Sequence, residues 1–106
     1  MITVIIKYSG VDNNAKKFME EMMSSGIVDQ IRNEEGNLRY EYLYPINDNE
    51  SVVLIDSWKD QKALDRHHQL PLMQKIASLR EKYDLHMKVE KYQSIEDGKD
   101  QKYIRK

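Results

Sequence analysis

The chain has 106 residues, no cysteine and a net charge of −1, because 17 Lys and Arg residues are interspersed among 18 Asp and Glu residues. This length suits one domain with a single core, the absence of cysteine excludes disulfides and cysteine metal sites, and the mixed charge offers no basic stripe for nucleic acid or an anionic membrane. No stretch approaches the roughly 20 apolar residues of a membrane-spanning helix and the start lacks the basic region of a signal peptide, so we expect a soluble, cytoplasmic protein.

The first third of the chain predicts a strand followed by an amphipathic helix. Residues 2–8 are mostly apolar and β-branched, which is typical of a strand buried on much of both faces. A turn follows, and Asp12 is placed to cap a helix. Gly26 should end this helix, with a further helical turn over 27–31. The apolar residues of the helix recur every three or four positions and form a methionine-rich inner face: Ala15, Phe18, Met19, Met22 and Met23.

The middle of the chain predicts a hairpin of two strands. A polar break over 33–36 precedes residues 38–44, where Leu38, Tyr40, Tyr42 and Tyr44 alternate with other residues and share one face. These side chains fit either a pocket wall or a seam between subunits. Residues 45–51 form the polar hairpin connection and 52–58 the next strand.

The last part predicts two helical segments, a strand and a charged tail. Asp60 is a second helix cap, and Pro71 should break the helical region near residues 69–70 before a segment over 72–83. Ala63, Leu64 and His67 share one helical face. The final strand covers 86–92, with Met87, Val89 and Lys91 on one side. We therefore predict a domain over 1–93 and a tail or dimer arm over 94–106.

This β-α-β-β-α-β order is the ferredoxin-like α+β arrangement, with a four-stranded antiparallel sheet. Two amphipathic helices can cover only one face of such a sheet, yet the strands carry apolar residues on both faces. A second copy of the chain is the simplest cover for the other face, so we expect a homodimer in which two sheets form a dimeric α+β barrel.

Three short motifs in this order carry a family resemblance. They are Glu35-Gly36-Asn37-Leu38-x-Tyr40-Glu41, the strand end Ile55-Asp56-x-Trp58, and Asp60-x-x-Ala63-Leu64-x-x-His67. Over residues 2 to about 93 the chain resembles the antibiotic biosynthesis monooxygenase family. The resemblance implies a dimeric α+β barrel with one ligand pocket per subunit, between the sheet and its own helices.

Members of that family include quinol and anthrone oxygenases that need neither metal nor flavin, haem-degrading enzymes, and proteins that process small metabolites. The haem-degrading members carry a Trp about where His67 stands and a haem-ligating His near the position of Ala77, so the resemblance argues against haem. Leu54 and Leu64 stand where the anthrone-oxidising branch has an Asn and a Tyr, so the substrate of that branch is not carried over.

Three residues are candidates for catalysis. His67 is the candidate base, since an imidazole can accept a phenolic proton at neutral pH; the alternative is a structural histidine bonded to a backbone carbonyl. Asp56 lies on the same strand face as Trp58 and is placed to orient His67 or a ligand hydroxyl, or to pair with Arg39. Asn37 offers an amide over the pocket, although Gly-Asn is also ordinary turn chemistry.

Five further residues are candidates for binding the substrate. Trp58 offers a stacking face, though a single Trp at a strand end also suits a core, and the others shape the cavity: Tyr42, Met73, Leu64 and Met22. His68 points further round the helix, and we assign it no role. No set of three or four side chains converges as metal ligands, and no glycine-rich phosphate loop is present, so we expect no metal and no cofactor.

These residues and the resemblance together predict a cofactor-independent monooxygenase that oxidises a small aromatic or enolic substrate, quinol- or anthrone-like, with dioxygen. Two alternatives stay open. One is an isomerase or lyase that acts on a small metabolite without consuming dioxygen. The other is a ligand-binding stress protein with no chemistry.

Overall fold

A computed structural model describes residues 1–106 and contains four strands, four α-helices and one short 3₁₀ helix. In chain order they are β1 (Ile2–Ser9), α1 (Asn14–Ser24), α2 (Ile27–Arg32), β2 (Asn37–Leu43), β3 (Ser51–Trp58), α3 (Gln61–His68), α4 (Leu72–Lys82), β4 (His86–Gln93) and η1 (Gln101–Tyr103). The predicted ferredoxin-like α+β fold is confirmed, with each helical region divided in two near Gly26 and Pro71 as the sequence indicates.

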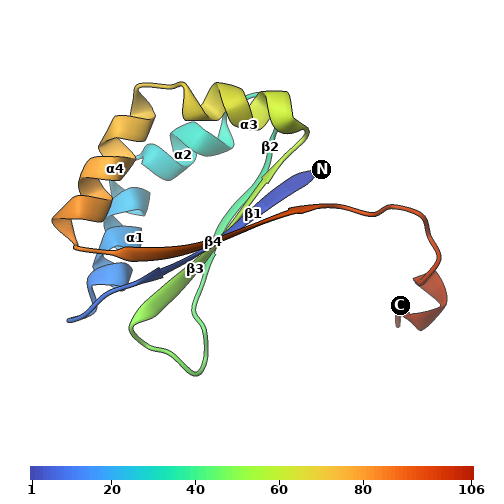
Figure 1. Cartoon of the computed structure of the whole chain (residues 1–106), viewed down its shortest axis with the longest axis horizontal. Helices are drawn as coiled ribbons and strands as arrows, with labels where there is room; N and C mark the ends of the chain where they lie inside the picture. The colour runs from blue at the N-terminus through green and yellow to red at the C-terminus, as the bar shows by residue number, and fades with distance from the viewer.

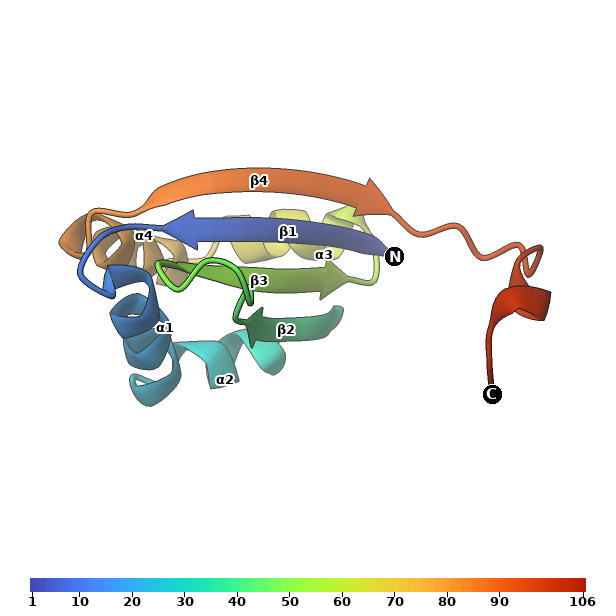
Figure 2. The same ribbon diagram turned by 90° about the horizontal axis from the view of Figure 1, so that it is seen from below.

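The four strands form one antiparallel sheet in the order β2-β3-β1-β4 (Figure 2). Ile6 pairs with Leu54 on one side and with Val89 on the other, so these three side chains share a face. All four helices lie on that same side of the sheet (Figure 1). The period-2 alternation of the strands therefore directs one set of side chains toward the helices and leaves the other set without a cover.

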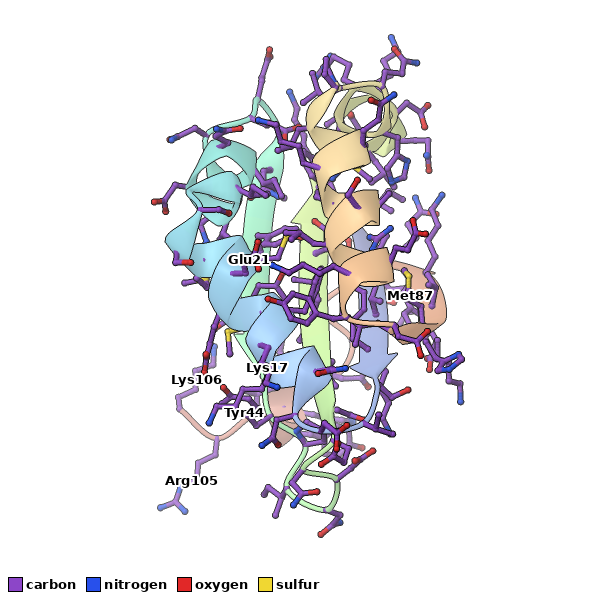
Figure 3. The ribbon with its side chains drawn as sticks, turned by 90° about the vertical axis from the view of Figure 1, so that its left-hand side faces the viewer. Lys17, Glu21, Tyr44, Met87, Arg105 and Lys106 are labelled. Atoms are coloured by element: carbon purple, nitrogen blue, oxygen red, sulfur yellow. The ribbon has the colours of Figure 1, made fainter.

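The core lies between the sheet and the helices. The rings of Tyr8 and Phe18 have centroids 4.8 Å apart, and both residues are fully buried. Figure 3 shows α1 and α2 beside α4, with Glu21 of α1 between them. An oxygen of Glu21 accepts hydrogen bonds from Lys82 Nζ at 2.7 Å and from Tyr83 Oη at 2.5 Å. These bonds tie the first helical region to the end of the second.

The two predicted helix caps have different outcomes. Asp60 is extended and its carboxylate accepts a hydrogen bond from the Ala63 amide at 2.9 Å, as predicted. The prediction for Asp12 is wrong, because α1 begins at Asn14, its N-cap is Asn13, and that residue makes no side-chain cap. Asp12 and Asn13 both have left-handed backbones, whereas a capping residue needs an extended backbone to turn its oxygen onto the free amides.

Two predictions of burial need correction. Met23 is 44% exposed, because it lies one residue, or about 100°, round the helix from the fully buried Met22. β1 is buried on one face only. Val4 and Ile6 face the helices, while Ile5 lies on the outer face and is half-buried. The outer face has no cover within this chain.

The C-terminal segment, residues 94–106, leaves the sheet after β4 and extends away from the helices (Figures 1 and 2). Nearly all of it is exposed, including Ile95, Tyr103 and Ile104. None of the helices combines the length and the hydropathy that a membrane crossing requires.

Candidate active site

A cavity of about 420 Å³ lies between the sheet and the helices α3 and α4. This volume falls within the range of pockets that hold small ligands. All four strands and both helices contribute to its wall, which is mainly apolar. The apolar residues are Val4, Ile6, Leu54, Leu64, Met73, Ile76, Met87 and Val89.

His67 lines the cavity from α3 and is 3% exposed. Its Nδ1 atom lies 2.9 Å and 3.1 Å from the two carboxylate oxygens of Glu34. An ionised carboxylate can only accept, so Nδ1 carries the hydrogen and Nε2 is left free to take a proton. The structural alternative for His67, a bond to a backbone carbonyl, is not what the structure contains.

Gly36 explains how Glu34 reaches the histidine. The backbone of Gly36 has φ +86°, and a Cβ atom at this position would lie 2.6 Å from Ala63 Cβ. Only glycine therefore allows the turn to pack directly on the first turn of α3. The carbonyl of Gly36 also accepts a hydrogen bond from the Lys59 amide at 2.8 Å. The turn and the helix are thus held together, with Glu34 directed at His67.

Asp56 lines the cavity from β3 and is 5% exposed. The pKa of its carboxyl is raised to about 7: burial is the largest cause, the hydrogen bond from Trp58 opposes the rise, and the negative charge of Glu34 adds to it. Its Oδ1 accepts from Trp58 Nε1 at 2.7 Å. Two of the three predicted partners of Asp56 are wrong: the acid at His67 is Glu34, and Arg39 instead pairs with Glu41 at 2.6 Å. The third, a ligand hydroxyl, stays a prediction.

Trp58 is fully buried and does not line the cavity, so its predicted role as a stacking face needs correction. Its ring lies behind His67, with centroids 4.7 Å apart. Together with its bond to Asp56, this contact makes the indole a support for two cavity residues. The alternative, that Trp58 belongs to the core, is the one that the structure favours.

Two of the other predicted binding residues, Leu64 and Met73, line the cavity, and three predicted residues do not. Met22 is fully buried in the core under α1. Tyr42 borders a separate hollow of about 200 Å³ beside Met19 and Arg32. The amide of Asn37 is directed at the carbonyl oxygens of Arg39 and Ser57, both at 3.4 Å, and is therefore a turn residue.

The predicted tyrosine face divides along β2. Tyr40 is buried and lines the cavity, and Tyr44 is exposed. Burial raises the pKa of Tyr40 well above its usual value, so its hydroxyl keeps its proton. Leu38 does not share this face: a register shift between Asn37 and Arg39 leaves Leu38 57% exposed.

Sequence reasoning missed Glu34 and Arg80 and gave no role to His68, which also lines the cavity. Arg80 lies on α4, one turn beyond the buried Ile76, so its helical spacing was the signal that could have revealed it. For Glu34 the only sequence signal was its position in the turn before β2. Because it lies far from His67 in the sequence, no local pattern indicates their contact.

The polar side chains of the cavity do not form a metal site, since no group of three or more His, Cys, Asp or Glu residues converges anywhere in the chain. The chemistry open to this arrangement is proton transfer by the pair of His67 and Glu34, hydrogen bonding by Asp56 and Tyr40, and charge stabilisation by Arg80. The apolar wall would keep such steps away from bulk water.

Residues 1–79 match the family model described as antibiotic biosynthesis monooxygenase. Solved structures share the fold at low identity. A candidate antibiotic biosynthesis monooxygenase from Deinococcus radiodurans is 18% identical, with a TM-score of 0.79 over 91% of this chain and 94% of that one. One from Nitrosomonas europaea is 19% identical, with a TM-score of 0.76 over 91% of this chain and 100% of that one.

A third similar structure is SnoaB, a cofactor-independent oxygenase from Streptomyces nogalater. It is 14% identical, with a TM-score of 0.70 over 90% of this chain and 93% of that one. No curated protein sequence matches the chain.

Proposed function

The chain belongs to the antibiotic biosynthesis monooxygenase family, and on that premise we propose that it oxidises a small quinol- or anthrone-like aromatic compound with dioxygen, without a metal or flavin. The observation that carries this proposal is the buried pair of His67 and Glu34 at the wall of an apolar cavity. The SnoaB likeness supports the absence of a cofactor, because that protein is a cofactor-independent oxygenase on the same fold.

His67 acts as the base in this proposal. The Glu34 carboxylate holds the hydrogen of Nδ1, so Nε2 accepts the proton of a phenolic or enolic hydroxyl. The imidazolium that forms remains bonded to Glu34 and lies against the ring of Trp58, and both contacts stabilise its positive charge. The substrate anion is now rich enough in electrons to reduce dioxygen.

The substrate itself supplies the electrons. Its anion passes one electron to dioxygen, and the two radicals then combine. For an anthrone, the CH₂ carbon becomes a carbonyl, one oxygen atom stays in the quinone, and the other leaves as water, with four electrons taken from the substrate. The apolar wall excludes water from the radical pair.

Asp56 acts as a hydrogen-bond donor to a substrate oxygen in this scheme. Burial raises the pKa of its carboxyl to about 7, so near neutral pH a large fraction of the molecules carry a protonated Asp56. A neutral carboxyl in an apolar site can donate where a carboxylate cannot. Leu64 and Met73 shape the apolar wall around the ring system.

The test is dioxygen uptake by metal-depleted protein with a panel of hydroquinones and anthrones, compared with blanks that lack protein. We expect uptake above the blank, and a loss of about 10²- to 10⁴-fold in His67→Ala, the usual contribution of a general base. His86→Ala is the matched control, because His86 is exposed on β4 and does not line the cavity.

Other outcomes would identify the alternatives. Uptake equal to the blank across the panel would contradict the proposal. Substrate consumption under nitrogen would instead indicate an isomerase or lyase. Thermal stabilisation by a ligand, about 2.7 kcal/mol at a hundredfold excess over its Kd, with no product would indicate a binding protein.

We also propose that the chain forms a homodimer through the outer face of the sheet. That face carries an apolar strip of Ile5, Val53, Ile55 and Leu43, and within this chain no element covers it. Light scattering after size-exclusion chromatography tests the proposal. A dimer that becomes a monomer in Ile55→Lys is expected, and a monomeric wild-type protein would contradict it.

A further inference from the structure

Arg80 is a positive charge in the cavity wall without a negative partner. It forms none of the four ion pairs of the chain, so no carboxylate oxygen lies within 4.0 Å of its guanidinium. One terminal nitrogen donates to the hydroxyl of Tyr8 at 3.0 Å. The Nε atom is buried and has no hydrogen-bond partner at all. An arginine has five N–H donors, and here a single one has an acceptor.

The side chain is nevertheless held in position. Tyr8 is fully buried on β1, and the guanidinium carbon lies 5.6 Å from the centroid of its ring. The hydroxyl and the ring face of Tyr8 thus fix Arg80 at the cavity, although neither supplies a negative charge. A guanidinium that is partly desolvated, positioned and unpaired is arranged to receive an anion from elsewhere.

Lys91 is a second cation on the cavity wall. Burial lowers the pKa of His68, and the charges of His67, Lys91 and Arg80 lower it as well, against an opposing effect of Asp65, so the neutral form of His68 is favoured. The one carboxyl on the cavity wall is Asp56, and Arg80 is not among the groups that shift its pKa. The wall therefore combines an apolar surface with a cationic side and no compensating anion beside Arg80.

We propose that the substrate of this cavity is a flat aromatic compound that bears a carboxylate, and that Arg80 binds that carboxylate. The planar fork of an arginine matches the two oxygens of a carboxylate, and the apolar wall matches the ring system. Tyr8 is a positioning residue, because it orients Arg80 and does not line the cavity. This inference rests on the proposed function only in taking this cavity as the substrate site.

The experiment measures binding and needs no turnover. Calorimetry compares anthracene-2-carboxylate with anthracene-2-carboxamide, two probes of nearly equal shape that differ in charge. We expect the wild-type protein to bind the carboxylate at least about tenfold more tightly, which corresponds to one charge-assisted contact. In Arg80→Gln this preference should disappear, while Arg80→Lys should retain part of it.

Arg66→Gln is the matched control, since Arg66 is exposed on α3, forms no ion pair and does not line the cavity. It should keep the full preference. Tyr8→Phe removes only the hydroxyl, and it should reduce the preference without abolishing it. This second variant tests the inference even if Arg80→Gln fails to fold.

The inference is overturned if the wild-type protein binds the two probes equally, if it binds neither, or if Arg80→Gln keeps the preference. Its failure differs from that of the proposed function. A preference for the carboxylate with no dioxygen uptake would leave the inference standing and remove the oxygenase. Dioxygen uptake with no preference for the carboxylate probe would support the oxygenase and overturn the inference.

Discussion

The helical layer has two halves that share the same order of elements but differ in the residues that face the sheet. In the half formed by α1 and α2, the inward residues Phe18, Met22 and Ile31 are fully buried and pack on the sheet. In the half formed by α3 and α4, the inward residues include His67 and Arg80, and a cavity of about 420 Å³ remains. The same strand–helix–helix–strand unit thus forms a close-packed core in one half and a polar-edged pocket in the other.

The difference between the halves shows where a small domain can accommodate a cavity with polar side chains. Buried polar groups destabilise a core unless they are paired, so they are tolerated where the neighbouring half supplies the stability. Asp56 and His67 are buried polar residues at the cavity, whereas all the buried residues of α1 and α2 are apolar. Three predictions test this division.

The largest effect is expected from a pair of methionine truncations. Met22→Ala removes a fully buried side chain and should lower the free energy of unfolding by about 2–5 kcal/mol. Met73 is half-buried and lines the existing cavity, so its side chain makes fewer contacts than that of Met22. Met73→Ala should therefore lower the free energy of unfolding by less than half as much. Urea denaturation of both variants measures the difference. Equal costs would remove the distinction between the two halves.

The next effect is a dependence of stability on pH that arises at the cavity. The pKa of Asp56 is about 7 in the folded protein against an ordinary 3.8, so its contribution to stability is complete below pH 4 and is lost as the pH rises toward 7. Asp56→Asn should therefore be increasingly more stable than the wild type over this interval. At about 1.4 kcal/mol per pH unit, the difference should level off near 4 kcal/mol.

Urea denaturation at several pH values between 4 and 8 measures that difference. An asparagine oxygen can still accept the bond from Trp58, so the packing is preserved. Met22→Ala serves as the control, because it removes no titrating group and its difference from the wild type should not vary with pH. A constant difference in Asp56→Asn would show that this carboxyl has an ordinary pKa.

The smallest of the three effects concerns the pair that carries the proposed function. Glu34→Gln removes the charge that holds the Nδ1 hydrogen of His67 and stabilises the imidazolium. Turnover should fall by about 10- to 100-fold, the kinetic equivalent of a charge-assisted hydrogen bond, with KM little changed. Glu35→Gln, at an exposed neighbouring acid, is the control. An effect on KM alone would make Glu34 a binding residue rather than a positioning one.

Much of the fold was predictable from local patterns. The alternation in β2 and β3, the helical spacing from Ala15 and the Asp60 cap each depend on residues within a few positions of one another. The failures were also local in origin. Asp12 has the right side chain for a cap, but its left-handed backbone is decided by how the turn after β1 meets α1.

The site was predictable only in part. Helical and strand periodicity, together with the pocket that the family resemblance implies, directed His67, Asp56, Leu64 and Met73 toward one cavity. Periodicity did not distinguish Trp58 from the residues that line the cavity, because Trp58 is on the same strand face but is covered by the ring of His67. Whether an inward side chain ends in a cavity or behind another residue depends on the volumes of neighbours from distant segments.

The sequence by itself determined the order of the elements, the face that each presents to the core, and the family to which the chain belongs, because periodicity and motifs are properties of neighbouring positions. The tertiary structure alone decided the partners: Glu34 with His67 across 33 residues and Arg80 with Tyr8 across 72. Such pairs depend on how the turn at Gly36 and the helix α4 pack on the sheet. Packing is set by the whole chain at once, so no short pattern records it.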